Sequence, residues 1–162
     1  MNAREAIRRP VPFCTPLSSL DDVGRMMYES DQPAIPVVDG TGKVVGLLTD
    51  RELAMAMAAK NRGAGQILVR ELLGGELIRC LADDAIGDVF DKMKSQRLRS
   101  LPVVDAEGKS VGVLSLEDLA HASRKGGITH EQIVSILEVL GKTRGENGET
   151  PPKWPWINAA SR

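Results

Sequence analysis

Two short segments place a hydroxyl and a carboxylate three residues apart, and such a pair could hold a sugar. One segment is Gly46-Leu47-Leu48-Thr49-Asp50-Arg51-Glu52 and the other is Gly112-Val113-Leu114-Ser115-Leu116-Glu117-Asp118. A carboxylate can accept hydrogen bonds from two adjacent ribose hydroxyls, and the N–H groups at a helix start suit a phosphate. The same spacing is that of a helix capping box. Both interpretations, a ligand site and a helix cap, fit the residues.

The two segments are equivalent positions of an internal repeat. A shift of 66 residues lays Ala3–Ala54 over Val69–Ala120 without a gap, and 17 of the 52 aligned residues are identical. About three identities are expected by chance at ordinary residue frequencies. Two units of ~60 residues bury too little surface alone and should share one core. We expect the repeats at 3–60 and 67–125, with a linker at 61–66.

In both repeats the residue pattern predicts elements in the order helix, strand, helix, strand, strand, helix. The apolar content is 42% but only 3% of residues are aromatic, so the core should be aliphatic. Thr49 and Ser115 are expected to cap the last helices, with Glu52 and Asp118 closing capping boxes. Ser18 or Ser19, and Asp83 or Asp84, are candidate caps for the middle helices. The helices are predicted at 3–9, 20–30, 50–60, 68–74, 86–95 and 116–125, and the strands at 11–14, 35–38, 44–48, 77–80, 101–104 and 110–114.

A further helix and a polar tail are expected after the second repeat. Thr129 and Gln132 form a capping-box pattern, which predicts a helix over 128–141. The tail at 142–162 is polar with Gly and Pro, and it should be flexible. It contains Trp154 and Trp156, which could anchor it on this protein or on a partner.

The totals exclude several classes of function. The net charge is −1, with 21 basic and 22 acidic residues, so neither nucleic acid nor a membrane is an expected partner. No signal peptide or membrane-spanning run is seen, which predicts a soluble, cytoplasmic protein. Cys14 and Cys80 are equivalent in the repeats and should be small buried residues, not a disulfide or a metal site. No catalytic residues emerge, because no base lies near a nucleophile, so we do not expect an enzyme.

The repeated motifs resemble those of a known family. Pro-Val-Val-Asp, then Gly-Lys, then Gly-x-Leu-Thr/Ser with an acid three residues on, occur twice in register over 3–125. This resembles a tandem pair of cystathionine-β-synthase (CBS) domains, a Bateman module. The resemblance implies an α+β fold with two pseudo-symmetric β-α-β-β-α repeats packed through their sheets. It also implies clefts between the repeats that bind adenosine-containing ligands, frequent dimerisation, and a regulatory, non-catalytic role.

The resemblance also implies roles for particular residues. At a first site, Ser115 and Asp118 would contact the ribose, and Arg97 and Arg99 would contact phosphate. The first repeat offers Asp31 and Pro33 at the arginine positions, and its carboxylate, Glu52, is one methylene longer than the usual Asp. The cleft at Ser115 and Asp118 should therefore bind the ligand better than the cleft at Thr49 and Glu52. Its other expected residues are Val113, Val11, Phe13 and Thr15. The second, weaker site would use Thr49, Glu52, Arg51, Leu47, Ile78 and Leu81.

Two hypotheses of function follow. In the first, the chain is a regulatory module for energy sensing that binds AMP, ADP, ATP or another adenosine derivative, requires no cofactor, and signals to a client protein. It would act as a homodimer. In the alternative, the chain is a ligand-independent dimerisation and protein-interaction module that uses the Trp-containing tail.

Overall fold

The computed structural model describes residues 1–142, which form two compact units of mixed helix and strand. The first-repeat unit comprises Val11–Ile78 and the short loop Glu107–Ser110. Among the described residues, the second-repeat unit comprises Met1–Pro10, Arg79–Ala106 and residues 111–142. The α+β class is confirmed, while the expected bounds of the repeats along the sequence stay a prediction.

The first-repeat unit is built on one β-hairpin. Strands β1 (Ala34–Val38) and β2 (Val44–Thr49) are antiparallel, with an irregularity at the Val37/Val38 step. The strand predicted at 11–14 was wrong, because only Cys14 pairs, in a single parallel bridge to Val37. Pro12, two residues earlier, has no N–H to extend the ladder. The helical elements are α2 (Leu20–Ser30), α3 (Asp50–Lys60), η1 (Ala64–Gln66) and η2 (Val69–Glu71).

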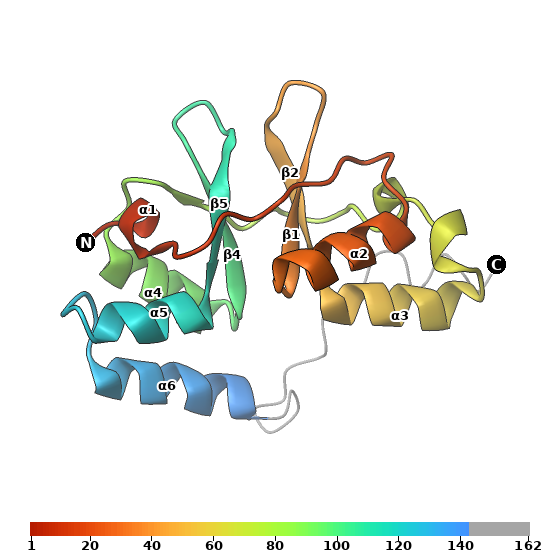
Figure 1. Cartoon of the computed structure of the whole chain (residues 1–162). Coiled ribbons are helices and arrows are strands. Elements are labelled where there is room, and N and C mark those ends of the chain that lie inside the picture. The colour runs from red at the N-terminus through yellow and green to blue at the C-terminus, as the bar shows by residue number, and fades with distance from the viewer. Residues whose placement is uncertain (143–162) are drawn as a thin grey trace. The chain divides into compact units, whose positions relative to one another are not determined.

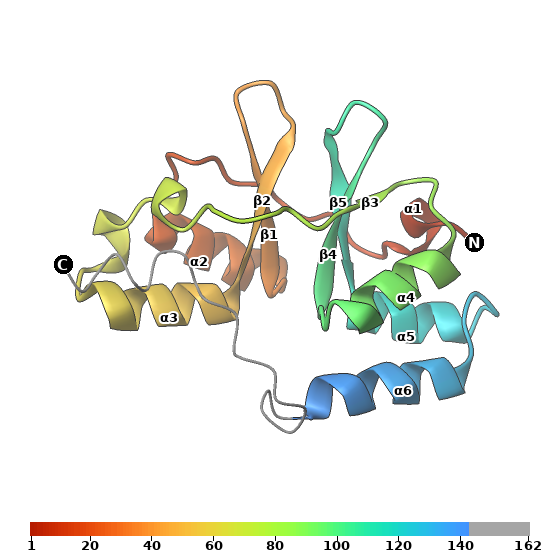
Figure 2. The same ribbon diagram turned by 180° about the vertical axis from the view of Figure 1, so that it is seen from behind.

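The second-repeat unit has a three-stranded sheet in the order β3-β4-β5. Figures 1 and 2 show its hairpin of β4 and β5 with α4 and α5 beside it. The strand predicted at 77–80 begins only at Cys80, and it pairs in parallel with β4. Helix α1 contacts both α4 and α5, and α6 also contacts these two helices. The elements are α1 (Ala3–Ala6), β3 (Cys80–Leu81), α4 (Ile86–Ser95), β4 (Ser100–Val104), β5 (Ser110–Ser115), α5 (Leu116–Ser123) and α6 (His130–Gly141).

The segment that leads into the first repeat is part of the second-repeat unit. Three backbone hydrogen bonds tie it there: Ala3 N donates to Asp84 O at 2.9 Å, Arg4 N to Ala82 O at 3.0 Å, and Ile86 N to Met1 O at 3.2 Å. The side chains of Ala3 and Ala6 are buried. Residues 1–10 therefore complete a unit that begins some 70 residues later in the chain.

The segment that leads into the second repeat is, conversely, hydrogen-bonded into the first-repeat unit. Val69 N donates to Ser18 O at 2.9 Å, Arg70 N to Pro16 O at 2.9 Å, and Leu20 N to Ile67 O at 3.0 Å. Each of these three bonds corresponds to one of the three bonds made by residues 1–4, with every donor and acceptor shifted by 66 residues. The two repeats have thus exchanged their leading segments by one and the same pattern of hydrogen bonds.

The glycine of the repeated Gly-x-Leu-Thr/Ser motif lies under these exchanged segments. A Cβ on Gly46 would meet Leu73 Cδ2 at 2.5 Å, and a Cβ on Gly112 would meet Ile7 Cδ1 at 3.1 Å. Gly112 also has a φ of +155°, which L side chains rarely adopt. Close approach of Leu73 and Ile7 explains why both repeats have glycine here.

Several local predictions needed correction. The helix expected at 3–9 ends at Ala6, because Ile7 turns to extended backbone, and the one expected at 68–74 is the 3₁₀ turn η2, followed by glycines that form helix poorly. Ser19 caps α2 as predicted. Asp83 and Asp84 do not cap α4: Ala85 is its N-cap, and the Asp84 carboxylate accepts from Leu81 N at 2.9 Å in the preceding turn.

The C-terminal helix is confirmed as α6, and its capping box closes with Gln132 N donating to Thr129 Oγ1 at 3.2 Å. Trp154 and Trp156 lie outside the described residues. From residue 1 to residue 142, no helix is long and apolar enough to cross a lipid bilayer.

Candidate functional site

Ser115 and Asp118 form a closed, buried capping box at the start of α5. Ser115 N and Ser115 Oγ both donate to Asp118 Oδ2, at 2.9 and 2.8 Å, and Asp118 N donates to Ser115 Oγ at 3.2 Å. The two residues are only 7% and 9% exposed. This geometry fixes the rotamers of both side chains, so the predicted cap is confirmed.

The second oxygen of Asp118 is left for another partner. Both hydrogen bonds that the Asp118 carboxylate accepts from Ser115 end on Oδ2. Among the described residues, no fully buried side-chain oxygen lacks a hydrogen-bond partner. Oδ1 is therefore in contact with solvent, although the residue as a whole is buried. A buried carboxylate that the fold has oriented, with one oxygen reachable, is suited to accept hydrogen bonds from a ligand hydroxyl.

The equivalent pair in the first repeat forms a looser box. Thr49 N donates to Glu52 Oε2 at 2.9 Å, but Thr49 Oγ1 to Glu52 Oε2 is 3.3 Å, and Glu52 N to Thr49 Oγ1 is 3.4 Å. The longer Glu52 side chain must bend toward the helix N-terminus to bring its carboxylate to the backbone N–H and hydroxyl of Thr49. The box is confirmed, and its hydroxyl–carboxylate contact is 0.5 Å longer than the 2.8 Å of the second repeat.

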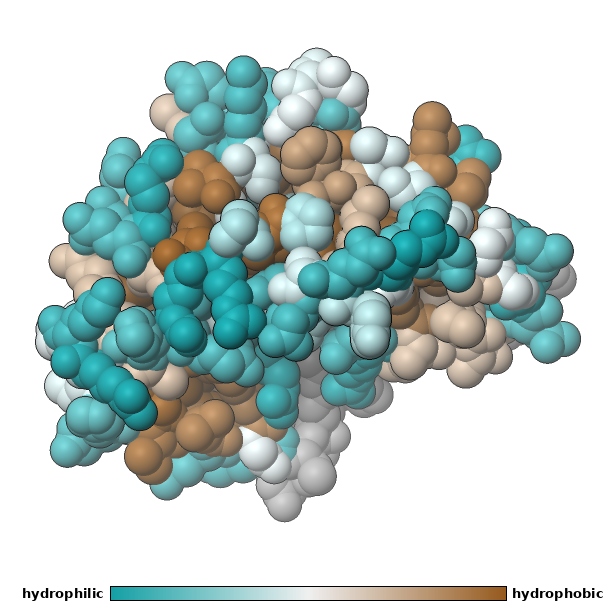
Figure 3. Space-filling model, viewed as in Figure 1, coloured by the Kyte–Doolittle hydropathy of each residue, from teal (hydrophilic) through white to brown (hydrophobic). Residues whose placement is uncertain are grey.

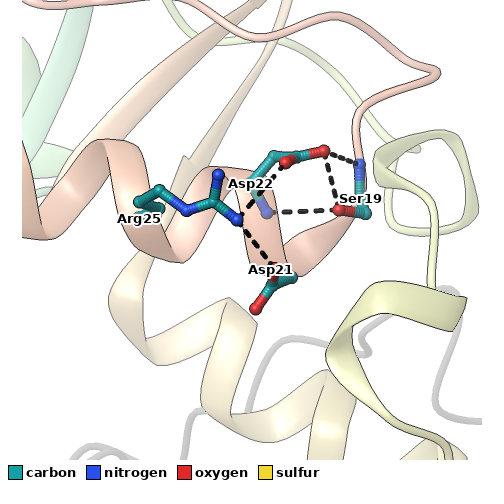
Figure 4. A network of polar contacts seen from close by, with 4 residues as sticks. All are labelled: Ser19, Asp21, Asp22 and Arg25. Atoms are coloured by element: carbon teal, nitrogen blue, oxygen red, sulfur yellow. Dashed lines mark hydrogen bonds and ion pairs between the residues drawn. The ribbon is translucent and has the colours of Figure 1, made fainter.

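A capping box alone does not identify a ligand site. Ser19 and Asp22 form one at the start of α2, with Arg25 bound to Asp21 at 3.0 Å beside it (Figure 4). That box is exposed, and neither of the repeated motifs contains it. What distinguishes the Ser115–Asp118 box is its burial and the residues around it.

Arg99 is placed next to the Ser115–Asp118 box. Leu116 N, in the first turn of α5, donates to Arg99 O at 3.1 Å, so the Arg99 backbone adjoins the helix start, and its side chain is exposed. In the first repeat, Asp50 N makes the equivalent bond to Pro33 O at 3.0 Å. The residue that bonds to the helix start is thus an arginine in the second repeat and a proline in the first, where Arg51 lies within α3 itself.

Arg97 has a different set of partners from those the sequence suggested. It has a left-handed backbone with φ 54°, in the turn after α4. Its guanidinium donates to Val139 O at 2.9 Å and to Lys142 O at 2.6 Å. These are carbonyls at the end of α6, where a cation is favourable because the helix dipole is negative. Its predicted phosphate contact would have to compete with these bonds.

The remaining predicted site residues are divided between the two units. Val113 is buried in the second-repeat unit at 3% exposure, and Leu81 in that unit is half exposed. The first-repeat unit holds the others, of which Phe13, Thr15 and Arg51 are exposed, and Val11, Leu47 and Ile78 are half-buried. The structure thus joins Ser115, Asp118 and Arg99 in one unit, and the composite first site stays a prediction.

Sequence reasoning assigned no role to Ile7 and Leu73, which contact the two motif glycines. A signal was present, because both residues and both glycines are related by the 66-residue shift. Such paired equivalence links two positions that are distant in the chain. In the sequence each leading segment adjoins the repeat that follows it, whereas in the fold it belongs to the unit of the other repeat.

The cysteines and the metal-ligating residues give no second site. Cys14 and Cys80 are free and buried, and burial raises the pKa of each thiol to about 11, so neither is a thiolate at neutral pH. In the described part of the chain, His, Cys, Asp and Glu do not gather in groups of three or more.

The Thr49–Glu52 box should make the free energy of unfolding depend on pH in the direction opposite to that of an ordinary capping carboxylate. Burial raises the pKa of Glu52, outweighing the hydrogen bonds from Thr49 that lower it. The native state therefore binds this proton more tightly than the unfolded chain, and its contribution is lost as pH rises through the native pKa. Glu52→Gln can still close the capping box. We expect this variant to gain stability relative to wild type as the pH rises above the ordinary Glu pKa of about 4.3.

Asp22→Asn serves as the control with the opposite sign. Hydrogen bonds from Ser19 lower the pKa of Asp22, so its contribution is present at neutral pH and is lost on acidification. Urea unfolding of wild type and both variants across this pH range measures the two slopes. A Glu52→Gln curve parallel to that of wild type would contradict the assignment.

Comparison with known proteins identifies the family. The family model described as "CBS domain" matches the chain twice, at residues 3–59 and 69–125. The chain therefore belongs to the CBS domain family and contains a tandem pair of these domains. It is 30% identical over 119 residues to the CBS domain-containing protein YhcV of Bacillus subtilis, covering 74% of this chain and 83% of YhcV.

Another relative is much longer than this chain. The chain is 26% identical over 102 residues to a homoserine O-acetyltransferase of Methanohalobium evestigatum, which is 63% of this chain but only 20% of that enzyme. The match thus spans about a fifth of the relative's length.

Solved structures share the fold. The CBS domain protein TA0289 of Thermoplasma acidophilum superposes with a TM-score of 0.74 at 21% identity, covering 88% of this chain and 78% of its own. The CBS domain pair of MJ0100, in complex with 5-methylthioadenosine and S-adenosyl-L-methionine, gives 0.66 at 23%, covering 75% and 98%. CBSX2 in complex with AMP gives 0.65 at 21%, covering 78% and 98%.

Proposed function

We propose that this chain is a non-catalytic regulatory module that binds an adenosine-containing ligand at the Ser115–Asp118 box. The ribose hydroxyls would donate to Asp118 Oδ1, and Arg99 would contact a phosphate or another anionic group. The observation that carries the proposal is the buried Asp118 carboxylate, held through Oδ2 while Oδ1 contacts solvent.

The asymmetry between the repeats supports one preferred site. The second repeat combines the shorter carboxylate, the tighter box and the adjacent Arg99. The first repeat has Glu52 in a looser box beside Pro33, which cannot contact a phosphate. A weaker site at Thr49 and Glu52, completed by Arg51, Leu47, Ile78 and Leu81, remains part of the proposal.

The chemical class of the ligand is inferred from the related folds. MJ0100 was solved with S-adenosylmethionine and methylthioadenosine, and CBSX2 with AMP. The shared part of these molecules is adenosine, whose ribose is what the Asp118 carboxylate is suited to bind. AMP, ADP and ATP would use Arg99 in addition, because a guanidinium binds phosphate oxygens well.

Calorimetric titration of the full chain with AMP, ADP, ATP, NAD, NADH and S-adenosylmethionine tests this function. Asp118→Asn retains a carbonyl oxygen for the cap but loses the charge that a ribose hydroxyl would bind. Hydrogen bonds to charged groups contribute about 1.5–3 kcal/mol, so affinity should fall about 10- to 100-fold. Arg99→Gln should weaken the binding of AMP but leave unchanged the binding of adenosine, which is titrated in parallel and has no phosphate.

Asp22→Asn is the matched control, because it makes the same substitution at the same position of another Ser-capped helix. It should leave the titrations unchanged. Thermal unfolding of both variants separates loss of fold from loss of binding. The proposal is wrong if wild type binds none of these ligands, or if Asp118→Asn binds as wild type does.

We propose further that occupancy is passed to a client protein and that the chain is a cytoplasmic homodimer. The tandem CBS pair supports this, since the resemblance implies regulatory modules that dimerise. Light scattering with and without AMP measures the mass of the assembly. A monomer under both conditions would contradict the dimer.

A further inference from the structure

Helix α6 has a line of exposed apolar surface that its own unit does not cover. Ile136 is fully buried, and α6 contacts α4 and α5. Val134 and Leu137 are 55% and 51% exposed. With His130 and Gly141 they follow the four- and three-residue spacing of one helix face. Figure 3 shows hydrophobic side chains gathered over α6.

Acidic side chains border this line. Glu131 and Glu138 are exposed and lie seven residues apart, so they share one side of the helix. We call Val134 and Leu137, with Glu131 and Glu138 along the edge, the α6 stripe. An occupant that fits it would present large apolar groups together with a cation.

The last described residue, Lys142, is held in place at the end of α6. Lys142 is the C-cap of the helix with extended backbone, and Arg97 binds its carbonyl at 2.6 Å. The next 20 residues contain Lys153-Trp154-Pro155-Trp156-Ile157, a basic residue followed by the only two tryptophans of the chain. This segment has the composition that the stripe requires.

The length of the tail permits the contact. Ten residues, 143–152, separate Lys142 from Lys153 and can span up to about 35 Å when extended. The 12 residues of α6 are about 18 Å long. Gly145 and Gly148 lie between the two and allow the chain to turn back.

We propose that the Trp154-Pro155-Trp156 segment docks on the α6 stripe of its own chain, with Lys153 against Glu131 or Glu138. Linkage through a short tail gives a millimolar effective concentration, so a small contact suffices. A second copy is a poorer occupant, because two half-exposed aliphatic side chains fall far short of the ~1,200 Å² that a stable interface needs.

Intrinsic tryptophan fluorescence of the full chain tests this docking directly, because both reporters lie in the tail. In wild type we expect a blue-shifted emission and acrylamide quenching several-fold weaker than that of a free peptide of residues 143–162. Leu137→Ser should bring both values to those of the peptide. Leu17→Ser, at an exposed leucine of the first-repeat unit, should leave them as in wild type.

Three results would overturn the proposal. Wild-type emission equal to that of the peptide would mean that the tail is undocked. Unchanged quenching in Leu137→Ser would place the tryptophans away from the stripe. Quenching that changes with protein concentration would assign the stripe to a second copy. Because Leu137 is exposed, the variant should fold, and hydrogen exchange of the α6 amides verifies this.

Discussion

Removing residues 1–10 is expected to destabilise the unit of the second repeat and to spare that of the first. The deletion takes away three backbone hydrogen bonds, the buried Ala3 and Ala6, and the Ile7 contact with Gly112. At about 1 kcal/mol for each hydrogen bond, and more for the apolar contacts, the loss is about 4 kcal/mol or greater. That is a large part of the 5–15 kcal/mol that holds a typical domain together.

Hydrogen exchange resolved by residue measures this effect. Amides of α4 and α5 should lose protection, and those of α2 and α3 should keep it. Arg4→Ala, at an exposed position of α1, is a mild control that should change little. Loss of protection in α2 and α3, with α4 and α5 unaffected, would contradict the exchange of leading segments.

Gly112→Val is expected to be the most damaging single substitution in the two motifs. Valine would have to adopt a φ of +155° and would press on Ile7. Backbone strain of this kind costs about 1–3 kcal/mol and overpacking costs a similar amount. Urea unfolding should show the loss as a lower midpoint.

The equivalent Gly46 gives a matched comparison, because its obstacle is only the flexible end of Leu73. Leu73→Ala should therefore relieve much of the cost of Gly46→Ala. Ile7→Ala should relieve little of the cost of Gly112→Ala, because the unfavourable φ remains. Double-mutant cycles measure both coupling energies. Equal rescue in both repeats would show that the backbone at Gly112 is not the obstacle.

The sequence predicted well the elements that local signals determine. Both hairpins, α3 and the capping boxes at Thr49, Ser115 and Thr129 were placed within a residue or so. The Val-rich strands are bounded by an Asp and a Gly turn, and each cap has its partner three residues on. These features need only neighbouring residues to form, and the repeat presented them twice.

What the sequence could not predict depends on contacts between distant residues. Arg97 reaches the end of α6, 42 residues away, and nothing near it in the chain indicates that partner. Asp84 looked like a cap but turns back to Leu81 N. Arg99 was predicted as a phosphate contact, but its carbonyl bond to Leu116 N, which places it beside the box, needed the fold.

The exchanged leading segments have a consequence for how such a chain can be divided. A cut in the linker between the repeats would leave two halves, each keeping a leading segment that belongs to the other half and lacking its own complement. A single-repeat ancestor with this geometry would have been complete only as a domain-swapped pair of identical chains. In the present chain, the divisions that keep each unit's own segments together fall after Pro10 and after Ile78, and not in the linker between the repeats.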